Sequence, residues 1–347
     1  MLMELIRARE RGIIIGSLPP GPLNRISDVP GVKVGHCTLA EGDIQTGVTV
    51  ILPPPENPFI EKLPAAAYVQ NGFGKTLGLI QIDELGTLET PIALCGTLNV
   101  GRVHDALVSY MVRLCARDGI HLTSVNPVVG ECNDGFLSDI QARPCGEAEL
   151  LAAIAGAEAD FPLGSVGAGR GTSCHSLKGG IGSASRQLEL DGEAYTAGVL
   201  VQTNHGRLAD LRLPDGRRPE EDFIRLHDGE APDKGSCMMV LATDAPLSDR
   251  QLRRVIRRMP VGLIRLGSYI GHGSGEICIG FSTANSVSIR DSRDILPVRQ
   301  LSEKKIDLFF RAAAEAAEEA VLDSMLCAGP VTGWQGHHKD SLSEIFG

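Results

Sequence analysis

The chain has 347 residues, more than the roughly 250–300 at which one hydrophobic core usually stops growing, so length alone favours two domains. It is 43% hydrophobic and 22% charged, as in an ordinary globular protein, and its formal net charge is −10. It contains no block of Lys and Arg long enough to follow a phosphate backbone. We therefore expect no nucleic-acid or anionic-lipid partner.

The cysteines and the first residues bear on the compartment. The nine cysteines are odd in number, form no CxxC pair and mostly have apolar neighbours. They indicate small core residues in a reducing compartment rather than a disulfide framework or a zinc site. The opening MLMELIRARERGIIIG carries charges where a signal peptide has its apolar run, and no stretch of about 18 apolar residues could span a membrane. We expect a cytoplasmic protein with no membrane partner.

Hydrophobic patterns predict strands and helices in mixed order. Strands are expected as a pair within 27–52 and at 65–72, 125–131, 194–204, 236–244 and 276–285. Helices are expected at 98–117, 146–159, 247–266 and 303–328. Ser248 should cap the third helix and Pro260 should kink it. Because no steady βαβ alternation appears, two layers of mostly antiparallel sheet between helices would fit.

Residues 205–235 form a polar segment rich in Pro, Gly and Asp, which predicts an exposed connector of a length that needs a functional reason. An apolar run then begins at Ser236. Cleavage before Ser236 would put a hydroxyl and an α-amine on one residue. The pKa of an α-amine lies near neutrality, so the amine could take the hydroxyl proton during attack. Gly235 suits such a cleavage because glycine tolerates strain and leaves its carbonyl accessible. An ordinary loop-to-strand turn is the alternative.

Two glycine-rich segments could also carry chemistry. In GHGSGEICIGFSTAN (271–285), the turn can present Ser274 and Glu276 to one site, where a carboxylate could hold an ammonium and a hydroxyl could relay a proton. A plain glycine hairpin is the alternative. The segment GAGRGTSCHSLKGGIG (167–182) lacks the endings and spacing of nucleotide-binding loops, so no cofactor is expected.

The histidines give no sign of a metal site. His104, His175 and His205 do not fall at the spacing of metal ligands along the chain. We therefore predict no bound metal.

Eight segments in order carry a resemblance to a known family. They are ISDVPGVKVGH (26–36), TGVTVILP (46–53), QIDELGTLETPI (81–92), VVGECNDGFLSDI (128–140), KGGIGSASR (178–186), GVLVQTNHG (198–206), GSCMMVLATDAPL (235–247) and GSGEICIGFSTAN (273–285). Together they resemble the L-aminopeptidase/D-Ala-esterase/amidase family, which includes the β-aminopeptidases and nylon-oligomer hydrolases. The ornithine acyltransferases share the general fold but use threonine.

The resemblance implies an α+β fold, an αββα four-layer sandwich of the N-terminal-nucleophile type. It implies self-cleavage into chains 1–235 and 236–347 that share one core, so a single domain 1–347 replaces the two domains favoured by length. By position, Ser236 matches the nucleophile, and Ser274 and Glu276 match the pair that orients its α-amine. Asn204 matches the oxyanion-hole residue. The family also implies a homotetramer of cleaved protomers.

Two further positions concern the substrate. Glu131 falls where the family has a carboxylate near the substrate amine. Asn133 stands in E-C-N-D-G where relatives carry the tyrosine of E-T-Y-D-G, so one oxyanion donor and the substrate preference are expected to differ, although an amide can still donate. The implied activity is release of N-terminal amino acids from small peptides, amides or esters. The alternatives are an endo-acting amidase, an acyltransferase on the same scaffold and a non-catalytic relative.

Overall fold

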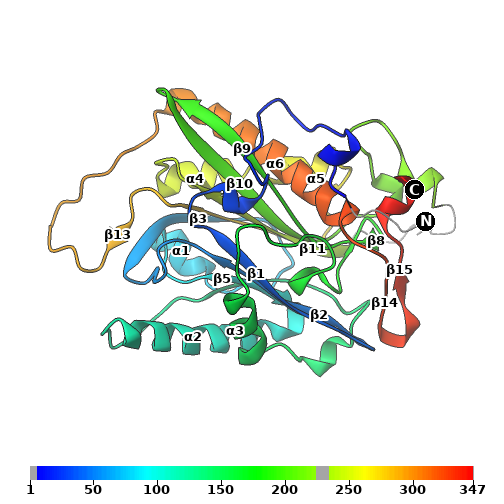
Figure 1. Cartoon of the computed structure of the whole chain (residues 1–347), viewed down its shortest axis with the longest axis horizontal. Helices are drawn as coiled ribbons and strands as arrows, with labels where there is room; N and C mark the ends of the chain where they lie inside the picture. Colours follow the sequence, from blue (N-terminus) through cyan, green and yellow to red (C-terminus); the bar gives the residue numbers. More distant parts are fainter. Residues whose placement is uncertain (1–5, 224–233, 347) are drawn as a thin grey trace.

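The computed structural model describes residues 6–223 and 234–346 as two stacked β-sheets with helices on both outer sides (Figure 1). The larger sheet has the strand order β13-β3-β12-β11-β10-β9, with β4 beside β3, and the smaller sheet has the order β1-β2-β5-β6. The larger sheet comprises β3 (Glu61–Gly72), β4 (Thr87–Leu88), β9 (Ile181–Leu190), β10 (Glu193–Asn204), β11 (Lys234–Thr243), β12 (Gly273–Ser282) and β13 (Val287–Ser288). The smaller sheet comprises β1 (Lys33–Glu41), β2 (Ile44–Leu52), β5 (Ile92–Gly96) and β6 (Val128–Cys132).

The helices α2 (Val100–Arg117), α3 (Glu147–Ala155), α4 (Asp249–Ile256), α5 (Pro260–Arg265) and α6 (Ile306–Leu326) form the two outer layers (Figure 1). The short helix α1 (Leu79–Leu85) instead packs Ile82 in the core between the two sheets. Helices α2 and α3 cover the smaller sheet, and α4, α5 and α6 cover the larger one. Two short hairpins complete the description: β7 (Ser173–Cys174) with β8 (Leu177–Lys178), and β14 (Val331–Thr332) with β15 (His338–Lys339). No helix in the described ranges is both long and apolar enough to cross a membrane.

Strand β11 lies at the centre of the fold and is buried on both faces. Met238 and Val240 pack in the core between the two sheets, whereas Met239 and Leu241 pack against the helical layer. Because alternate residues of a strand point to opposite faces, a strand covered on both sides reads as an unbroken apolar run. β11 pairs with β10 antiparallel and with β12 parallel. The parallel pair needs a crossover, which α4 and α5 provide.

The architecture confirms the predicted αββα sandwich, and each predicted helix and strand has a counterpart. The helix expected at 247–266 is two helices, since α5 begins at Pro260, and Ser248 caps α4 by accepting a bond from the Gln251 amide at 3.3 Å.

The connector predicted at 205–235 needs correction. Within 205–223 the segment forms two short 3-10 helices and buries four apolar side chains, Leu208, Leu211, Leu213 and Phe223. These four residues are too irregularly spaced to show the period of two of a strand or the period of 3.6 of a helix. The polar composition of the segment therefore predicted an exposed connector instead. Residues 224–233 lie outside the described ranges. The strand predicted from Ser236 starts at Lys234, so Gly235 is part of β11.

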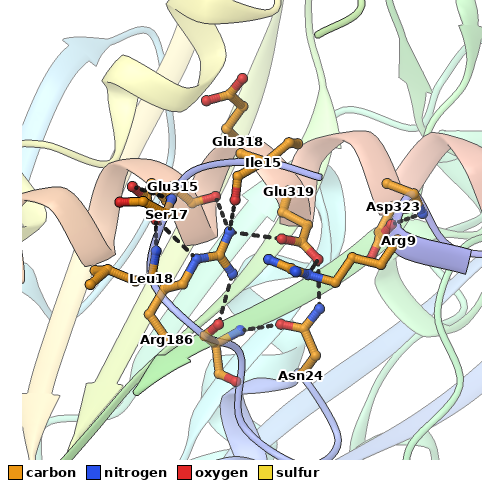
Figure 2. A network of polar contacts seen from close by, with 12 residues as sticks. Arg9, Ile15, Ser17, Leu18, Asn24, Arg186, Glu315, Glu318, Glu319 and Asp323 are labelled. Atoms are coloured by element: carbon orange, nitrogen blue, oxygen red, sulfur yellow. Dashed lines mark hydrogen bonds and ion pairs between the residues drawn. The ribbon is translucent and has the colours of Figure 1, made fainter. Parts of the chain in front are cut away.

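A buried network of charges joins the N-terminal segment, β9 and α6 (Figure 2). The guanidinium of Arg186 is fully buried and contacts Glu319 at 2.7 Å and Glu315 at 3.3 Å. It also donates to the carbonyl of Ile15 at 2.9 Å. Arg9 reaches Glu319 from the N-terminal segment, with 2.7 Å between Nε and Oε1. Because each of these charges is paired, the group can be buried without leaving an isolated ion.

Candidate active site

Strand register brings four of the predicted residues together at one end of the larger sheet. Asn204 is the Cα partner of Ser236 in the β10–β11 pair. In the β11–β12 pair, Gly235 lies opposite Ser274 and Cys237 lies opposite Glu276. The ends of three adjacent strands therefore supply an amide, a hydroxyl and a hydroxyl–carboxylate pair.

Ser236 has a buried hydroxyl that is not engaged elsewhere. The residue is 3% exposed, and its Oγ has no hydrogen-bond partner within the described part of the chain. The Cys132 thiol beside it donates to the carbonyl of Gln202 at 3.4 Å. Burial, with the Glu131 carboxylate adding to it, raises the pKa of that thiol above its usual range, so Cys132 stays protonated at neutral pH. Of these two side chains, the Ser236 hydroxyl is the one that could serve as a nucleophile.

The backbone of β10 lies so close to Gly235 that no side chain fits at this position. A Cβ at this position would lie 1.9 Å from the carbonyl oxygen of Asn204 and 2.9 Å from the Cα of His205. Both atoms are backbone and cannot rotate away. The peptide bond before Ser236 is therefore pressed against the end of β10.

Ser274 and Glu276 form a buried pair on β12. The Ser274 hydroxyl donates a short hydrogen bond to Glu276 Oε1, and both side chains are fully buried. The amide of Asn71 donates to the carbonyl of Ser274, which fixes the start of the strand. A carboxylate held in this way is suited to holding an ammonium at the neighbouring strand end.

Asn204 has a defined amide orientation. Its Oδ1 accepts a hydrogen bond from the backbone N–H of Ser173 at 2.9 Å. Because the oxygen is engaged, Nδ2 is the donor end that remains for a ligand.

A cavity of about 450 Å³ opens beside these residues, and Gly235, Ser236, Asn204, Glu131 and Asn133 are among those that line it. Of the four residues brought together by register, Ser274 and Glu276 lie behind the lining rather than in it.

The Glu131 carboxylate is fixed by two donors in the cavity wall. It accepts from the backbone N–H of Lys75 at 2.9 Å and from the hydroxyl of Thr97. Sequence reasoning missed Lys75 and Thr97, because they lie 56 and 34 residues from Glu131 and follow no motif.

The loop after Glu131 is held in place by hydrogen bonds of Asn133 and Asp134. The Asn133 side chain accepts from the N–H of Gly135 at 3.0 Å, which closes a small turn. Asp134 is buried and accepts from the Thr46 hydroxyl at 2.5 Å. Burial raises the pKa of Asp134 to about 6. Asn133 is exposed at the cavity rim, where a tyrosine would occupy much more of the opening.

Two histidines that are far apart in the sequence, His175 and His205, meet in the fold. Cys174, His175 and His205 each offer a donor atom, and the three atoms lie within 4.8 Å of one another. The β7–β8 hairpin folds back onto the end of β10, so residues 30 positions apart meet. Burial lowers the pKa of His205 to about 3, with His175 adding to the shift, so its imidazole is neutral at neutral pH.

The fold and this cavity define a serine aminopeptidase of the N-terminal-nucleophile class. The L-aminopeptidase D-Ala-esterase/amidase of Ochrobactrum anthropi, described as a prototype for the serine aminopeptidases and a variant of the Ntn hydrolase fold, has the same architecture. Its TM-score is 0.90 at 32% identity, over 98% of this chain and 96% of that one. A sequence model of peptidase family S58 matches residues 24–339. The chain belongs to peptidase family S58.

Two other relatives agree with this assignment. The β-peptidyl aminopeptidase BapA of Sphingosinicella xenopeptidilytica is 35% identical over 350 residues, covering 94% of this chain and 86% of that protein. The crystal structure of the PH0078 protein from Pyrococcus horikoshii OT3 has a TM-score of 0.92 at 43% identity, covering 98% of this chain and 97% of that one. The predicted family and the predicted aminopeptidase class are confirmed.

Proposed function

We propose that this enzyme cuts itself before Ser236 and then removes N-terminal residues from peptides, amides or esters, with Ser236 as nucleophile. The observation that carries the proposal is the buried Ser236 hydroxyl, which has no hydrogen-bond partner in the described ranges. Ser236 lies on β11 between β10, which carries Asn204, and β12, which carries the Ser274–Glu276 pair.

Self-cleavage would use the precursor's own backbone. Ser236 Oγ attacks the Gly235 carbonyl carbon, and its proton passes to the departing Ser236 nitrogen. This N→O shift replaces the amide by an ester. Water then hydrolyses the ester, leaving a carboxylate on Gly235 and a free α-amine on Ser236. The products are chains 1–235 and 236–347, both contributing to one αββα domain.

In turnover the new α-amine would act as the general base. It takes the Ser236 hydroxyl proton during attack on the substrate carbonyl and returns it to the leaving amine. The Asn204 amide is placed to donate to the tetrahedral oxyanion, a contribution of ~10²–10³ in rate at other enzymes. The Glu276 carboxylate, held by Ser274, would orient the α-amine.

Substrate choice would rest on Glu131. Its carboxylate lines the same cavity as Ser236 and is already oriented by Lys75 and Thr97. A substrate ammonium bound there would place the first amide bond near Ser236, which makes the enzyme exo-acting. Among its relatives, BapA is named as a β-peptidyl aminopeptidase, and the Ochrobactrum enzyme is named as an L-aminopeptidase and D-Ala-esterase/amidase.

We also propose that the protein acts as a homotetramer. Large apolar side chains are exposed on α1 and on the long segment between β13 and α6. The backbone of that segment projects from the body (Figure 1). Ile80 and Ile295 are each 87% exposed, and Val298 is 68% exposed. Apolar surface of this kind is typical of protein contacts. Light scattering would give the mass of the assembly, and a monomer would contradict the proposal.

The self-cleavage is tested by denaturing electrophoresis and mass analysis of the purified protein. Wild type should give two fragments, the smaller starting at Ser236. Ser236→Ala should remain whole and inactive on a panel of aminoacyl amides. Ser302→Ala, a matched change at an exposed serine, should behave like wild type. A fragment with another N-terminus, or cleavage that persists in Ser236→Ala, would overturn the proposal.

A further inference from the structure

A cluster of two imidazoles and one thiol lies beside the cavity and has no part in the proposed hydrolysis. One donor atom each from Cys174, His175 and His205 lies within 4.8 Å of the other two, and all three residues are buried. Within residues 6–223 and 234–346 it is the one such group of three or more His, Cys, Asp or Glu side chains.

His205 is in an environment that does not satisfy its ring. The residue is 1% exposed, and neither Nδ1 nor Nε2 has a hydrogen-bond partner among the described residues. A buried polar atom without a partner destabilises the fold, and here one ring contributes two. A purely structural role would be served better by an apolar side chain, so the ring is suited to a ligand.

The His175 ring has a defined tautomer. Its Nδ1 lies 3.0 Å from the carbonyl oxygen of Arg207. A carbonyl only accepts, so Nδ1 carries the hydrogen and the lone pair of the ring is on Nε2. An N–H donated to a backbone carbonyl is the usual outer contact of a metal-bound histidine.

The hairpin that carries His175 is strained in a way that brings the rings together. His175 and Ser176 form its turn with φ of 46° and 64°, values that such turns usually assign to Asn and Gly. The His175 and His205 rings meet edge to face, with centroids 5.4 Å apart. Strained positions of this kind are concentrated at functional sites.

We propose that Cys174, His175 and His205 bind a thiophilic divalent cation, with Zn²⁺ as the best fit. One thiolate and two imidazoles match the borderline-soft character of zinc. Cys174 would bind as the thiolate and release its proton to solvent. Zinc ligands at about 2.0–2.3 Å from the metal lie roughly 3.3–3.8 Å from one another. The three donor atoms, now within 4.8 Å of one another, would therefore need to move closer by about 1 Å through side-chain rotation. His205 lines the cavity, so a fourth position is open to water or to a ligand atom.

The site is placed to position Asn204. Ser173, one residue before Cys174, donates its N–H to the Asn204 side chain, and the N–H of His175 donates to the carbonyl of His205 at 2.6 Å. A cation held by these residues would clamp the β7–β8 hairpin to the end of β10. The bound metal should therefore stabilise the protein and hold Asn204 in place. Metal binding itself does not require that Ser236 be catalytic.

The test is a titration of the whole protein after dialysis against a chelator. Co²⁺ should bind at one equivalent per chain with a thiolate-to-cobalt charge-transfer band, and Zn²⁺ should displace it and raise the melting temperature. Cys174→Ser and His205→Gln should each weaken binding by more than about 100-fold, because even outer contacts of a metal ligand are worth about 10–100-fold. Cys145→Ala removes a buried thiol that packs with α2 and α3 and should bind metal like wild type.

Each other result counts against the site. Absence of a charge-transfer band in wild type would overturn the proposal, and so would equal affinity in Cys174→Ser. Melting curves recorded without metal show whether a variant has simply unfolded, and the near-isosteric Cys174→Ser keeps the test decisive if His205→Gln does not fold. All readouts are spectroscopic or thermal, so they stand whether or not self-cleavage is observed.

Discussion

Replacing Gly235 by alanine should slow self-cleavage strongly without removing any reacting group. The added Cβ would lie 1.9 Å from the Asn204 carbonyl oxygen, whereas ordinary contacts begin at 3.4 Å. The backbones of β10 and β11 must therefore separate by about 1.5 Å at the bond to be cut. A misplacement of about 1 Å can cost ~10²-fold in rate. We expect Gly235→Ala to cleave at least ~10²-fold more slowly than wild type.

The assay is a time course of precursor loss on denaturing gels, starting from freshly synthesised protein. Gly101→Ala is the matched control: it lies in α2, a Cβ there meets nothing within 4 Å, and alanine favours a helix by about 1 kcal/mol over glycine. It should cleave like wild type. Circular dichroism and a melting curve show that Gly235→Ala is folded. Cleavage of folded Gly235→Ala at the wild-type rate would refute the reasoning.

Three further changes test other parts of the molecule. Glu276→Gln should keep the fold but lower the pKa of the Ser236 α-amine by removing a nearby carboxylate, so the acid limb of kcat/KM should move to lower pH; an unchanged profile would exclude this role. Acetylating the substrate amine should lower kcat/KM at least ~10-fold, as expected for the loss of a charge-assisted bond worth roughly 1.5–3 kcal/mol. Glu131→Gln should erase much of the difference between the free and the acetylated substrate, while self-cleavage continues. Equal wild-type rates on the free and the acetylated substrate would indicate an endo-acting amidase. Arg186→Met should destabilise the fold by about 3–5 kcal/mol in urea denaturation because it removes the fully buried guanidinium that pairs with Glu315 and Glu319. Arg113→Met, at an exposed ion pair, should change stability by less than about 1 kcal/mol, and similar losses in both would refute the role of burial.

The sequence predicted those elements whose burial leaves a regular pattern. Residues 237–242 are apolar at every position because β11 is covered on both faces. Pro260 marks the break between α4 and α5, since a proline lacks the N–H that the helix interior needs. The β7–β8 hairpin has two residues in each strand, too few to show any period. Hairpins of that size depend on tertiary contacts, so they were missed.

The candidate active site was predictable only in part, because some of its residues meet only through the pairing of strands that are distant in the sequence. Ser236 and the Ser274–Glu276 pair are local features, and their neighbours in the chain indicate their chemistry. The facing of Asn204 and Ser236 depends on the register of β10 and β11, and the contact of Thr97 with Glu131 depends on how β5 and β6 pair. Register is set by packing across the whole sheet, so the resemblance supplied what the residues alone could not.

The buried charge network has a consequence for the order of events during synthesis. Arg9 and Arg186, together with Arg7, which pairs with Asp323 beside the network, precede residue 235, and the carboxylates they contact, Glu315, Glu319 and Asp323, follow it. Cutting before Ser236 would turn every one of these ion pairs into a bond between two separate molecules. A fragment made alone would have to bury several charges of one sign without their partners. We therefore expect neither fragment to fold stably by itself. The intact chain must therefore fold and form these ion pairs before it is cut. Once the cleaved protein is denatured, the two fragments should not reassemble into the native structure.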